Sequence, residues 1–182
     1  MKPQIFAFID TETTGLDFTK HEIIEIAGIV VKITDPSDAE SYEILDEFEY
    51  KIKPERITDA DPVSLKINHY DPSKWTEALS RTEAMKLVGD KTEGAVMISH
   101  NVSFDNAFID KAFKDSGLEN KMHYHRLDTV SMAYALLRNN ENVDHLSLRA
   151  LCEHFGIQQD KSHEALADVR ALLELYKKLM AL

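Results

Sequence analysis

The first strand that the sequence predicts ends in acidic residues. An uninterrupted apolar run, Ile5–Ile9, is followed by the stretch DTETTGL, which contains Asp10 and Glu12. An apolar run of this kind is typical of a strand that is buried on both faces of a sheet. Side chains two residues apart on a strand point to the same side, and open sheets place their ligand sites at the carboxyl ends of strands. The sequence therefore predicts two neighbouring carboxylates at a functional edge of a sheet.

The other predicted elements indicate an α/β fold. A β-branched run over residues 23–33 and an alternating run that ends at Pro54 flank a polar turn, which predicts an antiparallel hairpin. Residues 56–73 are expected to form a loop with a short helix. Short apolar strands then end at His100 and Asp128, and helices are expected after them. Strands first and strand–helix alternation later are typical of a mixed sheet covered by helices.

Apolar periodicity and turn residues predict where the helices begin and end. A helix whose apolar side includes Trp75 and Val88 is expected to stop at Gly89. Ser103 is expected to cap the next helix, which Gly117 would end. The remaining helices are expected at residues 129–137, at residues 147–155 and in the C-terminal segment.

Composition limits the classes of protein to which this chain can belong. With 182 residues, 43% of them hydrophobic, it is expected to form a single domain over residues 1–182. It lacks both an apolar stretch of the roughly 18 residues that a membrane span needs and a signal-peptide layout, so we expect a cytoplasmic protein with no membrane partner. The lone Cys152 excludes an internal disulfide and is expected to be a small buried residue. The formal charge of −11 argues against extended nucleic-acid binding, although metal ions can supply positive charge at one phosphate.

Two further acids lie where predicted elements meet or begin. Asp105 falls in SHNVSFD, where a strand breaks and a helix begins, and an acid there also has an ordinary role because it interacts favourably with the helix dipole. Asp168 lies at the edge of the apolar face of the last helix, and a carboxylate near a core needs hydrogen bonds, a cation or a metal. Together with Asp10 and Glu12, they would offer four hard oxygen ligands, which suit Mg²⁺ or Mn²⁺ rather than zinc. His163, at the start of the same helix, can turn toward solvent and substrate.

The stretches that carry these residues resemble the motifs of a known family. DTETTGL, HNVSFD and HEALAD occur in this order and are similar to the three exonuclease motifs of the DEDDh class of 3′–5′ exonucleases, the group of the DNA polymerase III epsilon proofreading subunit. The similarity covers nearly the whole chain. It implies a ribonuclease H-like mixed sheet flanked by helices, two divalent metal ions, Mg²⁺ or Mn²⁺, and stepwise release of nucleoside 5′-monophosphates from a 3′ end. By motif match, His163 would be the general base, and the metals would be held by Asp10, Glu12, Asp105 and Asp168.

The resemblance also indicates where the substrate would bind. Thr13, Leu16 and Phe104 fall where the family contacts the terminal nucleotide. Ile67 and Asn68 fall where it often has an apolar residue and a histidine. This chain departs from the pattern in two places: KINHYD lacks the glycine that usually follows that pair, and NVSFD has valine where a smaller residue is typical.

The expected function is metal-dependent 3′–5′ exonuclease activity on the 3′ end of single-stranded nucleic acid. DNA is favoured over RNA because DTETTG looks more like the DNA proofreading branch than the short-RNA-degrading branch. The alternatives are an exoribonuclease, a non-catalytic nucleic-acid-binding module on the same scaffold, and a metal phosphatase for small molecules. The chain stops directly after its last predicted helix, so we expect a free-standing nuclease and leave open a DNA polymerase partner that docks elsewhere.

Overall fold

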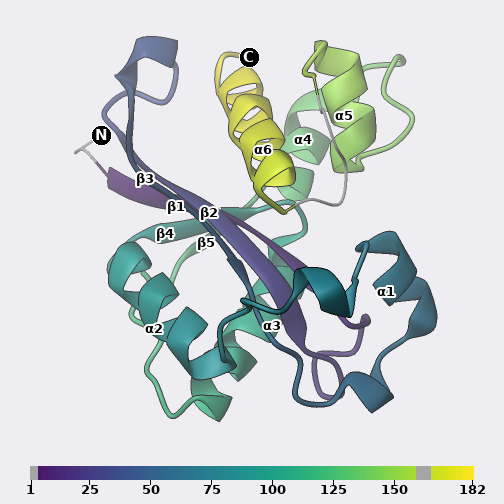
Figure 1. Cartoon of the computed structure of the whole chain (residues 1–182). Helices are drawn as coiled ribbons and strands as arrows, with labels where there is room; N and C mark the ends of the chain where they lie inside the picture. The colour runs from purple at the N-terminus through teal and green to yellow at the C-terminus, as the bar shows by residue number, and fades with distance from the viewer. Residues whose placement is uncertain (1–3, 159–164) are drawn as a thin grey trace.

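The computed structural model describes residues 4–158 and 165–182, and its centre is a twisted mixed sheet (Figure 1). The strand order is β3-β2-β1-β4-β5, with β2 antiparallel to both of its neighbours and β4 and β5 parallel to β1. Helices cover both faces of the sheet, which confirms the predicted α/β fold with its mixed sheet flanked by helices. The strands are β1 Gln4–Thr13, β2 Ile23–Ile33, β3 Tyr42–Lys51, β4 Val96–Ser99 and β5 Arg126–Asp128.

The helices agree with the sequence pattern in most places. The predicted helix over residues 129–137 is present as α4, and the one predicted at residues 147–155 is present as α5, which Ser147 caps. No helix in the described ranges is long and apolar enough to cross a membrane. The α-helices are α1 Pro62–Ile67, α2 Arg81–Thr92, α3 Val102–Asp115, α4 Thr129–Leu137, α5 Leu148–Phe155 and α6 Ala165–Met180, and short 3₁₀ helices cover Ala39–Ser41, Ile57–Asp59 and Pro72–Lys74.

Alternation along β1 divides the core into two layers. Ala7 and Ile9 pack in the layer that contains α2 and α3, whereas Phe6 and Phe8 pack against α6. Figure 1 shows α6 on one side of the sheet and α2 with α3 on the other. Because side chains alternate along a strand, Asp10 continues the series of Phe6 and Phe8 on the α6 face.

The predicted helix around Trp75–Val88 was wrong at both ends. Trp75 and Leu79 precede α2, which begins after the capping residue Ser80. The Trp75 indole is buried and donates a hydrogen bond to the Ile24 carbonyl, 2.9 Å away. Trp75 is therefore buried by tertiary contacts, and not as part of the apolar face of a helix. Gly89 lies inside α2, at a point where the helix packs closely against α3. A Cβ at this position would lie 3.2 Å from Phe113 Cε1, so the lack of a side chain permits the close packing.

The start of α3 also differs from the prediction. Asn101, and not Ser103, is the N-cap, with a left-handed φ of 69° and no capping hydrogen bond from its own side chain. The Asp128 carboxylate instead accepts hydrogen bonds from the backbone N–H groups of Asn101 and Val102, at 2.9 and 3.3 Å. A residue distant in sequence therefore satisfies the helix terminus. The predicted end is confirmed, because α3 finishes at Asp115 and Gly117 follows with φ +68°.

Candidate active site

Three of the four predicted metal ligands lie within reach of one ion. Asp10, Glu12 and Asp168 each offer a carboxylate oxygen, and these oxygens all lie within 4.8 Å of one another. Asp10 and Glu12 come from the carboxyl end of β1, and Asp168 comes from the first turn of α6. Since α6 packs on the face of the sheet to which Asp10 belongs, strand alternation and helix packing together explain the meeting of the three side chains. Hard oxygen groups at this spacing could hold a divalent cation.

The fourth predicted ligand, Asp105, adjoins the other three. It lies in the first turn of α3, is only 3% exposed, and accepts a 2.7 Å hydrogen bond from the Thr11 hydroxyl of β1. The charge of Asp105 raises the pKa of Asp10 more than the charge of Glu12 or the charge of Asp168 does. The structure therefore brings all four predicted carboxylates to one end of β1, which we define as the acid cluster.

Burial and mutual repulsion disfavour the charged forms of the acid cluster. Burial, followed by the charge of Asp105, raises the pKa of Asp10 well above its usual range. Burial and then Asp168 raise the pKa of Glu12 to about 8. Burial raises the pKa of Asp105 to about 7, against the opposing hydrogen bond from Thr11. A bound cation favours the deprotonated forms of its ligands, so metal and protons would compete at this cluster.

A fifth acid, Glu25, lies beside the cluster and was missed in the sequence. It is directly opposite Glu12 in the β1–β2 pair, is 5% exposed, and forms a 2.8 Å ion pair with Lys51 of β3. Its charge also raises the pKa of Glu12. The signal was present as the one acidic residue inside the β-branched run IIEIAGIVV. That signal could be interpreted only once the register between β1 and β2 was known.

The predicted substrate residues surround the same end of the sheet in two groups. The buried Thr13 hydroxyl donates to the Gly15 carbonyl, and the Asn68 amide donates to the Thr13 carbonyl, each at 2.8 Å. Leu16 and Ile67 are instead 78% and 45% exposed, so their apolar side chains are available for contact. Phe104, on the first turn of α3, packs its ring 4.9 Å from that of Phe108.

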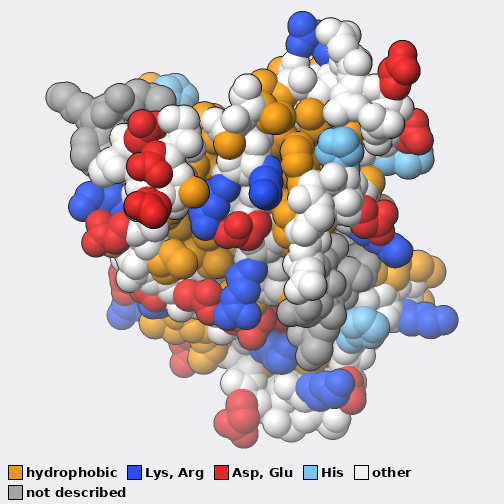
Figure 2. All heavy atoms as spheres, turned by 90° about the horizontal axis from the view of Figure 1, so that it is seen from above, with side chains coloured by type: hydrophobic (Ala, Val, Ile, Leu, Met, Phe, Trp, Pro, Cys, Tyr) orange, Lys and Arg blue, Asp and Glu red, His pale blue; other side chains and the backbone are white. Residues whose placement is uncertain are grey.

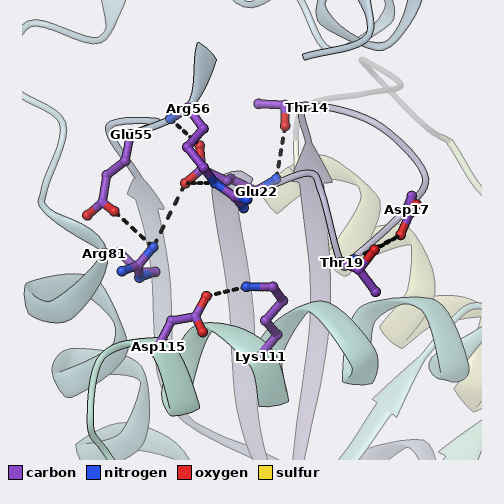
Figure 3. Close-up of polar contacts among 9 residues, drawn as sticks. All are labelled: Thr14, Asp17, Thr19, Glu22, Glu55, Arg56, Arg81, Lys111 and Asp115. Carbon is purple, nitrogen blue, oxygen red and sulfur yellow. Dashed lines mark hydrogen bonds and ion pairs between the residues drawn. The ribbon is translucent and has the colours of Figure 1, made fainter. Parts of the chain in front are cut away.

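An ion-pair network lies at the end of the β1–β2 loop, which carries Leu16 (Figure 3). The Glu22 backbone N–H donates to the Thr14 hydroxyl at 2.9 Å, and the Glu22 carboxylate accepts the Arg56 backbone N–H at 2.7 Å. Arg81 lies between two acids, with Nη1 3.8 Å from Glu22 and 3.1 Å from Glu55. We call Glu22, Glu55, Arg56 and Arg81 the Glu22 network. It connects the end of the β1–β2 loop to the segment that leads into α1 and α2.

His163, the predicted general base, falls outside the described residues. The described part of α6 begins at Ala165, two residues later. The role of His163 therefore stays a prediction, and the structural account of the site depends on the acid cluster.

Known proteins match this chain over most of its length. The family model described as "Exonuclease" (RNase_T) matches residues 7–176. The PolC-type DNA polymerase III of Caldanaerobacter subterraneus subsp. tengcongensis is 30% identical over 180 residues, which cover 96% of this chain and 11% of that protein. The PolC-type polymerase of Listeria monocytogenes is also 30% identical, over 175 residues, again covering 96% of this chain and 11% of the relative. This chain thus spans about a tenth of the length of these polymerases.

Solved structures match the fold over almost the whole chain. Escherichia coli exonuclease I in complex with a dT13 oligonucleotide gives a TM-score of 0.77 at 18% identity, covering 96% of this chain and 40% of that one. Exonuclease I from Methylocaldum szegediense gives 0.71 at 23% identity, covering 94% and 39%. These similarities show a shared fold. Because the exonuclease family model covers nearly all of the sequence, the chain belongs to the exonuclease family.

Proposed function

We propose that this protein is a metal-dependent 3′–5′ exonuclease that releases nucleoside 5′-monophosphates from single-stranded nucleic acid. The observation that carries the proposal is the meeting of Asp10, Glu12 and Asp168, with carboxylate oxygens within 4.8 Å of one another. Membership of the exonuclease family supports hydrolysis of phosphodiester bonds. The 3′–5′ direction and the product come from the motif resemblance.

In this proposal the acid cluster holds two divalent cations, Mg²⁺ or Mn²⁺. Asp10 is the best placed to contact both, because its side chain lies next to Glu12 and Asp168 and is also strongly affected by Asp105. When bound, the cations supply an activated water and neutralise charge at the scissile phosphate. His163 would accept the proton of the attacking water, a role that imidazole side chains commonly take near neutral pH.

The chain's other residues position the 3′ end. The exposed side chains of Leu16 and Ile67, together with Phe104, offer apolar contacts to the terminal nucleotide. The Asn68–Thr13 hydrogen bond keeps α1 against the end of β1, where the scissile phosphate would lie. These contacts hold the reacting bond near the acids, and such positioning is a large part of catalysis.

Single-stranded DNA is the proposed substrate. The structural match to an exonuclease I bound to a dT13 oligonucleotide supports this choice, as does the similarity to DNA polymerase III of the PolC type. The face viewed in Figure 2 shows basic side chains among acidic ones, with no large area of a single charge among the coloured side chains. That mixture fits attachment at a strand end better than binding along many phosphates.

The test is shortening of a 5′-labelled single-stranded oligonucleotide in magnesium. We expect a ladder of shorter products with wild type, and none with EDTA or with Asp168→Asn. Asp90→Asn, on the exposed side of α2, is the matched control and should give the wild-type ladder. A ladder that persists in EDTA would contradict the metal mechanism.

The same assay distinguishes the nucleic-acid classes. DNA and RNA oligonucleotides of equal sequence should be shortened with a higher kcat/KM for DNA. Faster digestion of RNA would favour the exoribonuclease alternative. His163→Ala should lower kcat, by about 10² to 10⁴-fold for loss of a general base, with a smaller effect on metal affinity.

A further inference from the structure

A pocket of about 230 Å³ lies beside the acid cluster. Its walls are the ends of β2 and β3 and the segment 68–75, and they include Glu25, Lys51, Asn68, His69 and Lys74. Two contacts connect it to the candidate active site. Glu25 lies opposite Glu12 in the sheet, and the Asn68 amide is hydrogen-bonded to the Thr13 carbonyl. The pocket therefore adjoins the predicted terminal-nucleotide contacts and shares Asn68 with them.

The acids of this pocket already have partners in the protein. Glu25 pairs with Lys51 at 2.8 Å, and the Lys51 ammonium lies 4.2 Å from the centre of the Trp75 ring. The Glu49 carboxylate accepts a hydrogen bond from the backbone N–H of Leu166, in the first turn of α6. These contacts give each carboxylate a partner in the protein. Burial, followed by the charge of Glu25, also raises the pKa of Glu49, so its charged form is disfavoured in the pocket.

Two cationic or ionisable side chains of the pocket are available to a ligand. Lys74 and His69 are exposed, and within residues 4–158 and 165–182 neither forms an ion pair. Both come from the same short segment, which Tyr70 and Trp75 anchor by packing their rings 5.0 Å apart. A lysine and an imidazole on one anchored segment are suited to an oxyanion such as a phosphate.

The backbone at His69 gives independent support. Its φ is +50°, a left-handed conformation that costs free energy for a residue with a side chain. The position is the one after Asn68 where the family pattern has glycine. The chain thus keeps the backbone shape that glycine would adopt and places an imidazole at the pocket. Strain of this kind is often retained at ligand-binding positions.

We infer that this pocket is a subsite for the second nucleotide from the 3′ end, in which Lys74 and His69 contact the internucleotide phosphate next to the scissile one. The inference rests on the proposed exonuclease function. When the 3′-terminal nucleotide lies on the acid cluster, the next phosphate lies one nucleotide away, and the pocket is a neighbouring cavity that offers an exposed lysine and an exposed imidazole. The ligand class is the phosphodiester backbone of single-stranded DNA.

The test compares two substrates that differ in the second nucleotide. One is a single-stranded DNA oligonucleotide, and the other is the p-nitrophenyl ester of thymidine 5′-monophosphate, which has a cleavable phosphodiester but no second nucleotide. For Lys74→Gln, the ratio of kcat/KM on the oligonucleotide to kcat/KM on the ester should fall up to about fivefold, the range of an exposed ionic contact. The slope of log KM against log salt for the oligonucleotide should fall by about 0.7.

His69→Gly separates binding from folding. Glycine adopts φ +50° without strain, so this variant should be at least as stable as wild type while showing the same lower substrate ratio. Lys178→Gln, in the last turn of α6 and far from the pocket, is the matched control and should keep the wild-type ratio and salt slope. A parallel loss on both substrates, or an unchanged ratio in both pocket variants, would overturn the subsite.

A binding measurement keeps the subsite testable apart from turnover. Anisotropy of a fluorescent oligonucleotide, with calcium in place of magnesium, should show weaker binding for Lys74→Gln and His69→Gly than for Lys178→Gln. If wild type binds in this pattern but hydrolyses neither substrate, the subsite survives and the proposed exonuclease function fails. Equal affinity for all four proteins would reject the subsite.

Discussion

The acid cluster and the Glu22 network both lie near the loop that joins β1 to β2, but their charges are arranged in opposite ways. In the Glu22 network, each acid faces an arginine, and Glu22 also accepts a backbone N–H from Arg56. In the acid cluster, Asp10, Glu12 and Asp168 face one another, and the charges of neighbouring acids raise the pKa of Asp10 and Glu12.

The two arrangements suit different roles: the Glu22 network suits folding, and the acid cluster suits the proposed chemistry. Opposite charges in a half-buried network hold two segments together, and the removal of one partner leaves the other charge unsatisfied. Like charges in a buried cluster raise the free energy of the folded state, and such strain persists where function retains it. A divalent cation would offset the repulsion in the acid cluster. The two clusters should therefore respond in opposite directions to charge removal.

The largest expected effect is the loss of activity in Asp10→Asn. We expect turnover on the oligonucleotide to fall roughly a thousandfold or more, because several kcal/mol of charge stabilisation at the phosphate would be lost. In EDTA, the same variant should have a higher Tm than wild type because one repelling charge is gone. Kinetics and thermal denaturation measure the two effects. A lower Tm with normal turnover would reverse the assignment of this cluster.

The next effect is a stability that depends on pH and metal together. The pKa of Glu12 rises from its usual 4.5 to about 8 on folding, so the folded state binds more protons than the unfolded state within that window. The stability of the metal-free protein should therefore fall as the pH rises from about 4.5 to about 8. Magnesium at about one hundred times its Kd should restore about 2.7 kcal/mol, most visibly at the upper end. Thermal denaturation with and without EDTA across this range is the measurement.

Glu22→Gln should act in the opposite direction from Asp10→Asn. It weakens the contacts with Arg56 and Arg81, so we expect a loss of about 1 to 3 kcal/mol of stability. The Tm should fall in EDTA as well as in magnesium. Urea denaturation gives the size of the loss, and Glu40→Gln, an exposed acid far along the β2–β3 hairpin, is the control. A rise in stability would place Glu22 with the repelling acids.

The smallest expected effect is at Lys111, which pairs with Asp115 one turn later on α3 (Figure 3). Both side chains are partly exposed, and helical pairs of this spacing are worth about 0.3 to 0.5 kcal/mol. Lys111→Gln should therefore change stability by no more than about this amount and should leave oligonucleotide turnover close to wild type. A loss as large as that of Glu22→Gln would show that the opposite-charge contacts extend from the Glu22 network onto α3.

Local patterns were sufficient for many elements of the fold. The apolar run at Ile5–Ile9 predicted β1, the β-branched run over 23–33 predicted β2, and the pattern over residues 147–155 predicted α5. Burial of Cys152 was also predicted from its helical surroundings. Each of these features depends on residues within a few positions of one another, so the sequence contains the whole signal.

Other features depended on partners distant in the sequence. The N-terminus of α3 is satisfied by Asp128, and Trp75 is held by the Ile24 carbonyl, so local helix signals misplaced both boundaries. Only the pairing of Glu25 opposite Glu12 showed that Glu25 lies beside the acid cluster. Local periodicity cannot predict such contacts, because it does not specify which strand or helix will lie alongside.

By itself, the sequence determined the two acids at the end of β1, the order of the three motifs and the elements that carry them. Only the tertiary structure decided that Asp168 would meet Asp10 and Glu12, because α6 had to pack on the β1 face that Phe6 and Phe8 occupy. It also decided that Glu25 and the 230 Å³ pocket would lie beside them. The physical reason is that side-chain alternation follows from the chain alone, whereas the partner of each face is selected by burial of apolar surface across the whole molecule.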